Sequence, residues 1–336
     1  MKKILIILIV IGSALMTQAQ DTHNTQFYTV PMVVNPAYTG FFSGNYRVGA
    51  NYRNQWRSIT TPYHTITAYA DGAFFKSDGR AMNTNWLGVG LAAIGDRAGD
   101  GNLTTTKIQF SAAYHFQLFD NALRISAGIG GHYTQKSFDP TLLYFDSQWT
   151  GTEFDTSMPQ QETFNSTAIN YTSLSSGLNI SYGIDETMDL YVSGAVHNMN
   201  QPTETFYEGA NKPGIKMVYE IGSNIYLRNV TIEPGIIGHF EKSTLNISAG
   251  SNFTFGLDGG YSSDAMTKVI LGGWLRYKDA FSPVIGAEFA ATRMLLSYDL
   301  NYSDLSPGSR GRGATELSIV HIGPINKRRT IGCPTF

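Results

Sequence analysis

Apolar and polar residues alternate along most of the chain with a period of two. In the stretch from Lys107 to Phe116, the even-numbered residues are apolar or aromatic, whereas the odd-numbered residues are polar or small. Successive side chains of a β-strand point to opposite faces, so this period indicates strands with one apolar face. The same alternation recurs in residues 123–134, 174–182, 245–257 and 294–302. The pattern therefore predicts an all-β protein.

About fourteen strands can be placed between turns along the chain. They are expected near residues 45–57, 62–74, 85–97, 102–118, 122–135, 170–183, 187–198, 214–228, 230–241, 244–257, 267–277, 280–290, 292–302 and 314–323. An even number of antiparallel strands is what a bacterial barrel made by one chain requires. The long connections at 137–169, 200–213 and 303–313 fall at one end, where such barrels carry their extracellular loops.

A strand with one polar face fits two architectures. In a soluble sandwich the polar face meets water outside, whereas in a membrane barrel it lines the lumen. The polar faces here carry many Gly, Ser, Thr and Asn residues, as a lumen would. Aromatic residues also gather near strand ends, as in interfacial girdles, for example at Tyr114, Tyr133 and Tyr298. We therefore expect a single antiparallel outer-membrane β-barrel of about 14 strands, with a sandwich as the alternative.

The first 19 residues have the pattern of a secretory signal peptide. Lys2 and Lys3 precede an apolar run from Ile4 to Leu15, and the small residues Thr17 and Ala19 precede the expected cleavage site. The apolar run is shorter than the roughly 18 residues that a membrane-spanning helix needs. We expect this segment to be removed on export, which leaves residues 20–336 as one barrel domain in a Gram-negative outer membrane.

Charge and composition narrow the classes of function. The chain has 24 Lys and Arg residues against 26 Asp and Glu residues, so it has no general basic field for binding nucleic acid. One cysteine excludes an intramolecular disulfide framework, and no Cys/His spacing resembles a zinc site. Hydrolase and phosphate-loop motifs are also absent from the sequence. We therefore expect no enzyme activity, no cofactor, no metal and no nucleic-acid partner.

Three arginines in the first expected strand share one face: Arg47, Arg53 and Arg57. A charge at mid-depth on the lipid side of a barrel costs about 2–4 kcal/mol, so these arginines are expected to face the lumen. Acidic residues expected to face the lumen from other strands are Glu220, Glu233, Glu241, Glu288, Asp299 and Glu316. Such a network would make the interior rigid and closed, and the alternative is an ion-conducting filter. His115 and His132 are expected to be polar lumen residues.

Residues 20–44 show little strand alternation. Pro36 disfavours the helical conformation for Asn35, so the chain should be extended or turned there. We expect either a periplasmic or barrel-plugging docking element or an ordered entry to the first strand.

The long connection between residues 137 and 169 mixes acidic and aromatic side chains. They include Tyr144, Phe145, Asp146, Trp149, Phe154 and Asp155. Because aromatic residues are enriched at interface hot spots, this loop is a candidate surface for a protein partner. The alternative is a solvated loop packed over the mouth of the barrel.

Several short motifs resemble the PorP/SprF family of outer-membrane proteins of the Bacteroidetes type IX secretion system. Near the start they are Gln26-Phe27-Tyr28, Asn35-Pro36-Ala37-Tyr38-Thr39-Gly40 and Tyr52-Arg53-Asn54-Gln55-Trp56. Further motifs are Gly88-Val89-Gly90, Asp96-Arg97-Ala98-Gly99, Ser297-Tyr298-Asp299-Leu300-Asn301, Glu316-Leu317-Ser318 and Cys333-Pro334-Thr335-Phe336. They follow the family's order along essentially the whole mature chain.

This resemblance implies an accessory role in protein secretion and gliding motility. The expected cargo is a large secreted adhesin, or another protein with a C-terminal sorting domain, that becomes anchored at the cell surface. Expected partners in the periplasm are an OmpA-like peptidoglycan-binding protein and components of the secretion ring. Motif residues that the resemblance makes candidates for docking are Asn35, Pro36, Ala37, Tyr38, Gly40, Arg53, Gln55 and Trp56, with Cys333, Pro334 and Phe336 in a C-terminal tail of residues 324–336. A passive porin or small-solute transporter is the alternative function.

Overall fold

The structure is a computed structural model. It describes residues 24–56, 61–76, 85–119, 122–164, 166–185, 187–206, 209, 211–257, 266–303 and 306–323. The expected signal peptide, Arg57 and the C-terminal tail with Cys333, Pro334 and Phe336 lie outside the described residues.

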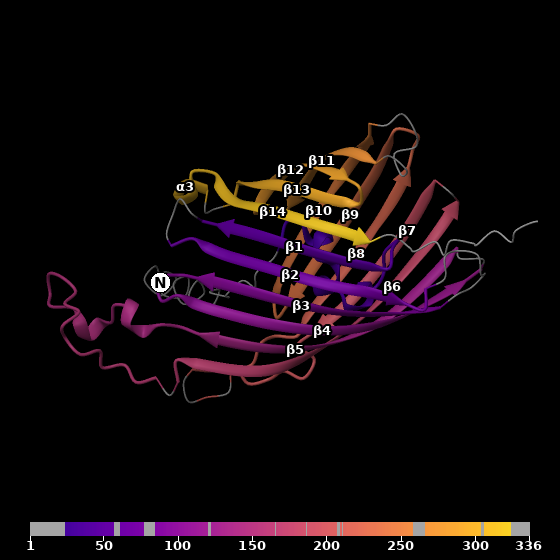
Figure 1. Ribbon diagram of the computed structural model, residues 1–336. Helices are drawn as coiled ribbons and strands as arrows, with labels where there is room; N and C mark the ends of the chain where they lie inside the picture. The colour runs from indigo at the N-terminus through magenta and orange to yellow at the C-terminus, as the bar shows by residue number, and fades with distance from the viewer. Residues whose placement is uncertain are drawn as a thin grey trace, which may run out of the picture.

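Fourteen antiparallel strands form a closed barrel, in which each strand pairs with its neighbours in sequence and β14 pairs with β1 (Figure 1). The strands are β1 (Tyr46–Gln55), β2 (Tyr63–Phe74), β3 (Trp86–Ala98), β4 (Leu103–Leu118), β5 (Leu123–Ser137), β6 (Ala168–Asp185), β7 (Met188–His197), β8 (Lys216–Tyr226), β9 (Val230–Glu241), β10 (Thr244–Gly256), β11 (Thr267–Arg276), β12 (Ala280–Phe289), β13 (Thr292–Asn301) and β14 (Arg312–Gly323). This confirms the fold predicted from the alternation, and β9 begins and ends at the expected residues.

The apolar faces of the strands point outward. On β4, Ile108 and Phe110 are 47% and 56% exposed, whereas the alternating residues Gln109 and Ser111 are fully buried. Exposed Leu, Ile and Phe side chains with buried polar ones are what a barrel in lipid requires. Because these apolar side chains are not packed between two sheets, the sandwich alternative is excluded.

The two ends of the barrel differ in the length of their connections. The first residue of β1 pairs with the last residue of β14, so both strands meet the same end of the barrel. That end carries the connections 186–187, 227–229 and 290–291 as well as 75–85 and 257–266. The opposite end carries the two longest connections, 138–167 and 198–215. Because long loops of such barrels face the cell exterior, we call these the periplasmic end and the outer end.

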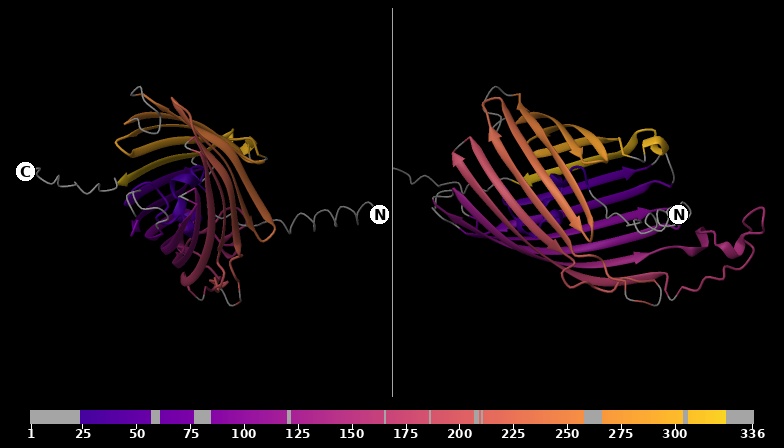
Figure 2. Two further views of the ribbon diagram at one scale, coloured as in Figure 1. Left: turned by 90° about the vertical axis from the view of Figure 1, so that its right-hand side faces the viewer. Right: turned by 180° about the vertical axis from the view of Figure 1, so that it is seen from behind.

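The segment before β1 lies inside the barrel (Figure 2). It contains η1 (Phe27–Thr29), α2 (Pro31–Val34) and η2 (Pro36–Tyr38), and we call residues 24–45 the lumen plug. Phe27 packs into an apolar cluster with Ala195, Val218, Ile237, Ile270, Trp274, Val284 and Leu295 of the wall. A second apolar cluster joins Val30 and Met32 to Tyr69 and Ala92.

The remaining helical elements lie in outer connections: η3 (Pro140–Leu142), η4 (Asp146–Gln148) and α3 (Ser306–Ser309). None of the helices in the described residues has the length and apolar character needed to cross a membrane.

Candidate functional site

The lumen plug starts at the outer end, where one carboxylate binds two of its backbone groups. The backbone N–H groups of Thr25 and Gln26 donate to the two oxygens of Glu316, at 2.8 and 2.9 Å. Glu316 lies on β14 and is fully buried. Asn51 of β1 donates to the same carboxylate at 2.7 Å. The strand wall therefore holds the first described turn of the chain.

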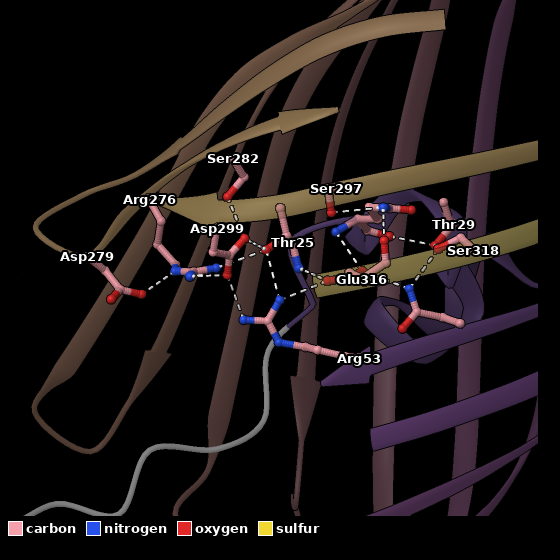
Figure 3. Close-up of polar contacts among 12 residues, drawn as sticks. Thr25, Thr29, Arg53, Arg276, Asp279, Ser282, Ser297, Asp299, Glu316 and Ser318 are labelled. Carbon is pink, nitrogen blue, oxygen red and sulfur yellow. Dashed lines mark hydrogen bonds and ion pairs between the residues drawn. The ribbon is translucent and has the colours of Figure 1, made fainter. Parts of the chain in front are cut away.

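Two arginines complete this site (Figure 3). Arg53 donates to Glu316 at 2.9 Å and to Asp299 at 2.8 Å, and Arg276 donates to Asp299 at 2.8 Å. Ser282 also donates to Asp299, at 2.6 Å. We call Thr25, Gln26, Arg53, Arg276, Asp299 and Glu316 the outer anchor.

The buried charges of the outer anchor balance, because two arginines face two buried carboxylates. Arg276 also pairs with Asp279, which is 37% exposed. The exposed fractions of the four charged side chains are between 0% and 6%. Breaking a buried ion pair by removal of one partner leaves an uncompensated charge and is strongly destabilising. This geometry therefore fixes the outer end of the lumen plug rigidly.

The middle of the lumen plug is held by polar contacts to β4, β6 and β7. Gln109 donates to the Met32 carbonyl at 2.8 Å, and Asn35 donates to the carbonyls of Leu178 and Gly194 at 3.2 and 3.3 Å. The Asn35 side chain also accepts from the Ala37 N–H and so caps η2. Asn35 has the extended backbone (φ −145°, ψ 118°) that a following proline favours.

The periplasmic part of the lumen plug contacts a second buried ion pair. Arg47 donates to Asp71 at 2.7 Å and to the Tyr38 carbonyl at 3.0 Å. Asp71 in turn accepts from the Gly40 N–H at 2.7 Å, and the Trp86 indole donates to the Gly40 carbonyl at 2.9 Å. We call Gly40, Arg47, Asp71 and Trp86 the inner anchor.

Gly40 is required here by both conformation and space. Its φ of +74° is in the region that favours glycine, and a Cβ atom on it would lie 2.5 Å from the Cα of Gly88. The two glycines let the chain pass directly against β3.

The lumen histidines bind neighbouring polar groups. His115 contacts the Thr39 carbonyl at 2.8 Å and Ser126 at 2.7 Å, and His132 contacts Ser175 at 2.8 Å. His115 therefore also fixes the lumen plug to the wall.

Most of the predicted motif residues near the start of the chain are enclosed by the barrel. Asn35, Pro36, Ala37, Tyr38 and Gly40 are buried in the lumen plug, where a partner cannot reach them in this arrangement. Gln55 ends β1 and Trp56 follows it at the outer end, where the Trp56 ring packs edge-on against Tyr63 at 4.8 Å.

The predicted lumen charges fall into separate groups. Arg53, Asp299 and Glu316 join the outer anchor, and Arg47 joins the inner anchor. Arg293 of β13 lies 2.9 Å from Glu288 and 3.3 Å from Glu233, and Lys268 lies 2.9 Å from Glu288. We call these last four residues the periplasmic cluster. Glu241 is the last residue of β9, at the outer end.

Asp71, Trp86 and Arg276 were not predicted as site residues. Each lies on the inward face of its strand, and Asp71 is the cross-strand neighbour of Arg47. An acidic residue on the polar face of the second expected strand was a signal that could have identified Asp71.

The connection at 138–167, which we call the outer arm, extends beyond the strand ends (Figure 1). Trp149 and Phe154 form a β-bridge, and their rings lie 4.9 Å apart. Tyr144, Trp149 and Phe154 are 63%, 48% and 46% exposed. Phe145 packs on Phe164 at the base of the outer arm. The aromatic side chains at its tip are therefore presented to solvent by an ordered turn.

Acidic groups accompany these aromatic side chains. Asp146 opens η4, and Asp155 donates its backbone N–H to the Gln148 carbonyl at 2.9 Å. The hydroxyl and backbone N–H of Ser157 lower the pKa of Asp155, and those of Thr141 lower the pKa of Asp139. The outer arm therefore carries ionised carboxylates at neutral pH.

Within the described residues, no three His, Cys, Asp or Glu side chains converge on a metal-binding position. The polar groups of the site instead bind one another and the backbone of the lumen plug. The arrangement can hold a peptide segment rigidly inside a barrel.

Solved structures with a similar fold include two described as hydrocarbon channels. A structure described as the CymD monoaromatic hydrocarbon channel has a TM-score of 0.53 and 10% sequence identity, and the match covers 88% of this chain and 93% of that one. A deltaS2 mutant of the TodX monoaromatic hydrocarbon channel has a TM-score of 0.50 and 9% identity, over 87% and 93% of the two chains. At these identities the likeness shows the fold alone. No curated protein sequence matches the chain.

Residues 16–320 match the family described as type IX secretion system membrane protein PorP/SprF. This match covers most of the chain and includes every described strand except the last residues of β14. The predicted family is therefore confirmed, and it is a family of secretion-system membrane proteins, not of enzymes. The chain belongs to the PorP/SprF family of type IX secretion system membrane proteins and forms an outer-membrane β-barrel.

Proposed function

We propose that this protein is a non-enzymatic docking post of the type IX secretion system. In this role it supports the secretion of large adhesin-like cargo with a C-terminal sorting domain and anchors that cargo at the cell surface, where it serves adhesion or gliding. The observation that carries the proposal is the lumen plug, which is fixed to the wall at both ends by buried ion pairs. A filled and rigid barrel suits mechanical attachment better than passage of solutes.

The cargo is proposed to bind on the outer side. The outer arm presents three exposed aromatic side chains beside the carboxylates of Asp146 and Asp155. Aromatic anchors with a charged rim are common at the centres of protein interfaces. On the periplasmic side, the proposed partners are the OmpA-like peptidoglycan-binding protein and the secretion ring, while outer-membrane lipid surrounds the wall.

Deletion of residues 140–160 tests the role of the outer arm. We expect surface display of the cargo to be lost, while the barrel still assembles and keeps its heat-dependent shift in gel mobility. Lys278→Ala in the short outer connection of β11 and β12 is a matched control that should leave display intact. Normal display by the deletion variant would reject the outer arm as the cargo-binding surface.

Affinity isolation from mildly solubilised membranes tests the function itself. We expect mass spectrometry to identify a large adhesin or another protein with a C-terminal sorting domain. Recovery of barrel-assembly factors alone would count against the proposal. Passive transport, as in the channels of similar fold, would require a path through the lumen that the lumen plug occupies.

A further inference from the structure

One buried carboxylate of the lumen differs from the others. Asp71, Asp299 and Glu316 each lie within 2.9 Å of an arginine. Glu220 of β8 is only 7% exposed, yet in the part of the chain that the structure describes no Lys, Arg or His side chain pairs with it. Its partners are hydroxyl groups, because Tyr38 donates to it at 2.8 Å and Tyr191 at 3.3 Å.

The fully buried amide of Asn179 on β6 lies in the same cross-strand row as Glu220 on β8. Among the residues that the structure describes, neither the oxygen nor the nitrogen of the Asn179 side chain has a hydrogen-bond partner. Asn179 is the cross-strand neighbour of Ser193, which is the cross-strand neighbour of Glu220. Side chains at directly opposed positions have Cβ atoms about 5 Å apart, so the three face the same part of the lumen.

The lumen plug covers this row from the inside. The Tyr38 hydroxyl lies 3.0 Å from Ser193 Oγ as well as 2.8 Å from Glu220. Since buried polar groups in folded proteins nearly always have partners, the Asn179 amide in the same row as the unbalanced carboxylate of Glu220 indicates that another species binds at this place.

We propose that Glu220, Asn179, Ser193 and Tyr38 form a binding site for a monovalent cation of the sodium class. Carboxylate, amide and hydroxyl oxygens are ligands for hard cations and not for soft transition metals. A single carboxylate balances a single positive charge, whereas calcium sites draw their affinity from several charged ligands. A bound cation would join the plug residue Tyr38 to β6, β7 and β8 and so fasten the middle of the lumen plug.

The test is thermal unfolding of the purified full-length protein in detergent at fixed pH. Sodium chloride is compared with choline chloride at equal ionic strength, and a ligand that binds only the folded state raises the Tm. We expect sodium to raise the Tm of the wild type by roughly 3–5 °C with a saturable concentration dependence.

Two variants assign the effect to the site. Glu220→Gln and Asn179→Ala should each lose the sodium-dependent increase in Tm, and either one suffices if the other does not fold. Glu204→Gln is the matched control, because Glu204 pairs with Lys136 away from this row and should keep the increase.

Three results would overturn the proposal. The Tm of the wild type could be equal in both salts. That result would mean that Glu220 is protonated and that water, not a cation, binds beside Asn179. The sodium effect could persist in both variants, which would place it elsewhere. Calcium chloride could produce a larger increase than sodium, which would exclude a monovalent site.

Discussion

The outer anchor and the periplasmic cluster are built from the same residue types in one lumen, yet their surroundings differ. The charged side chains of the outer anchor are at most 6% exposed, whereas those of the periplasmic cluster are 13–26% exposed. Of these two groups, the outer anchor is the one that binds the lumen plug in the described residues, through the backbone N–H groups of Thr25 and Gln26. The comparison indicates that the lumen plug covers the charged side chains of the outer anchor and shields them from water. Their ion pairs therefore hold the plug to the wall.

The largest expected difference is in the stability lost when one carboxylate of each group is replaced by an amide. Glu316→Gln leaves Arg53 with only Asp299 and weakens the bonds to the Thr25 and Gln26 N–H groups. Because a buried charge is then left unbalanced, we expect a loss of about 3–5 kcal/mol in the free energy of unfolding. Glu233→Gln, in the hydrated periplasmic cluster, should cost about 1 kcal/mol or less.

Denaturant unfolding in detergent, followed by heat-dependent gel mobility, measures both variants. Equal losses for Glu316→Gln and Glu233→Gln would show that the lumen plug does not change the electrostatics of the outer anchor.

The next largest loss of stability is expected when a glycine of β5 that contacts the lumen plug is replaced by alanine. A Cβ atom on Gly128 would lie 2.5 Å from the Ala37 backbone nitrogen, whereas a Cβ atom on Gly131 meets nothing within 4 Å. Gly128→Ala should therefore displace the lumen plug and cost about 1–3 kcal/mol. Gly131→Ala on the same strand is the control and should be close to neutral in the same unfolding measurement. A neutral Gly128→Ala would mean that the lumen plug packs loosely against β5.

The smallest expected effect concerns Lys76, at the periplasmic end of the lumen plug. Its ammonium group donates to the Phe42 carbonyl and lies 5.0 Å from the Trp86 ring centre. Burial, with Arg124 and Arg47 nearby, lowers the pKa of Lys76 from 10.5 to about 8. Between pH 8 and 10.5 the unfolded chain therefore binds more protons at this position, and stability should rise with pH.

The difference between wild type and Lys76→Met isolates this contribution from other titrating groups. We expect the wild type to gain on the order of 1 kcal/mol relative to the variant over this window, measured by unfolding at several pH values. Parallel pH profiles would show that Lys76 keeps an ordinary pKa in the folded protein.

The lumen positions of Arg53, Asp299 and Glu316 could be predicted from the sequence because the period of two is a local property. Which of these residues pair could not be predicted, since Arg53 meets Asp299 only after β14 closes the barrel against β1. Arg276 was missed for the same reason, because it reaches the outer anchor from β11. The path of residues 24–45 has no periodic signal at all. It follows from contacts with seven strands of the wall, β2, β3, β4, β6, β7, β8 and β14, most of which are distant in sequence.

Electrical conductance of the purified protein in planar lipid bilayers tests the central claim most directly. The lumen plug, fixed at its outer and inner anchors, should leave the wild-type barrel without stable open-channel steps. Gly128→Ala, which displaces the lumen plug, should show more frequent transient openings than Gly131→Ala. Persistent conductance by the wild-type protein would contradict a closed lumen and favour a passive channel.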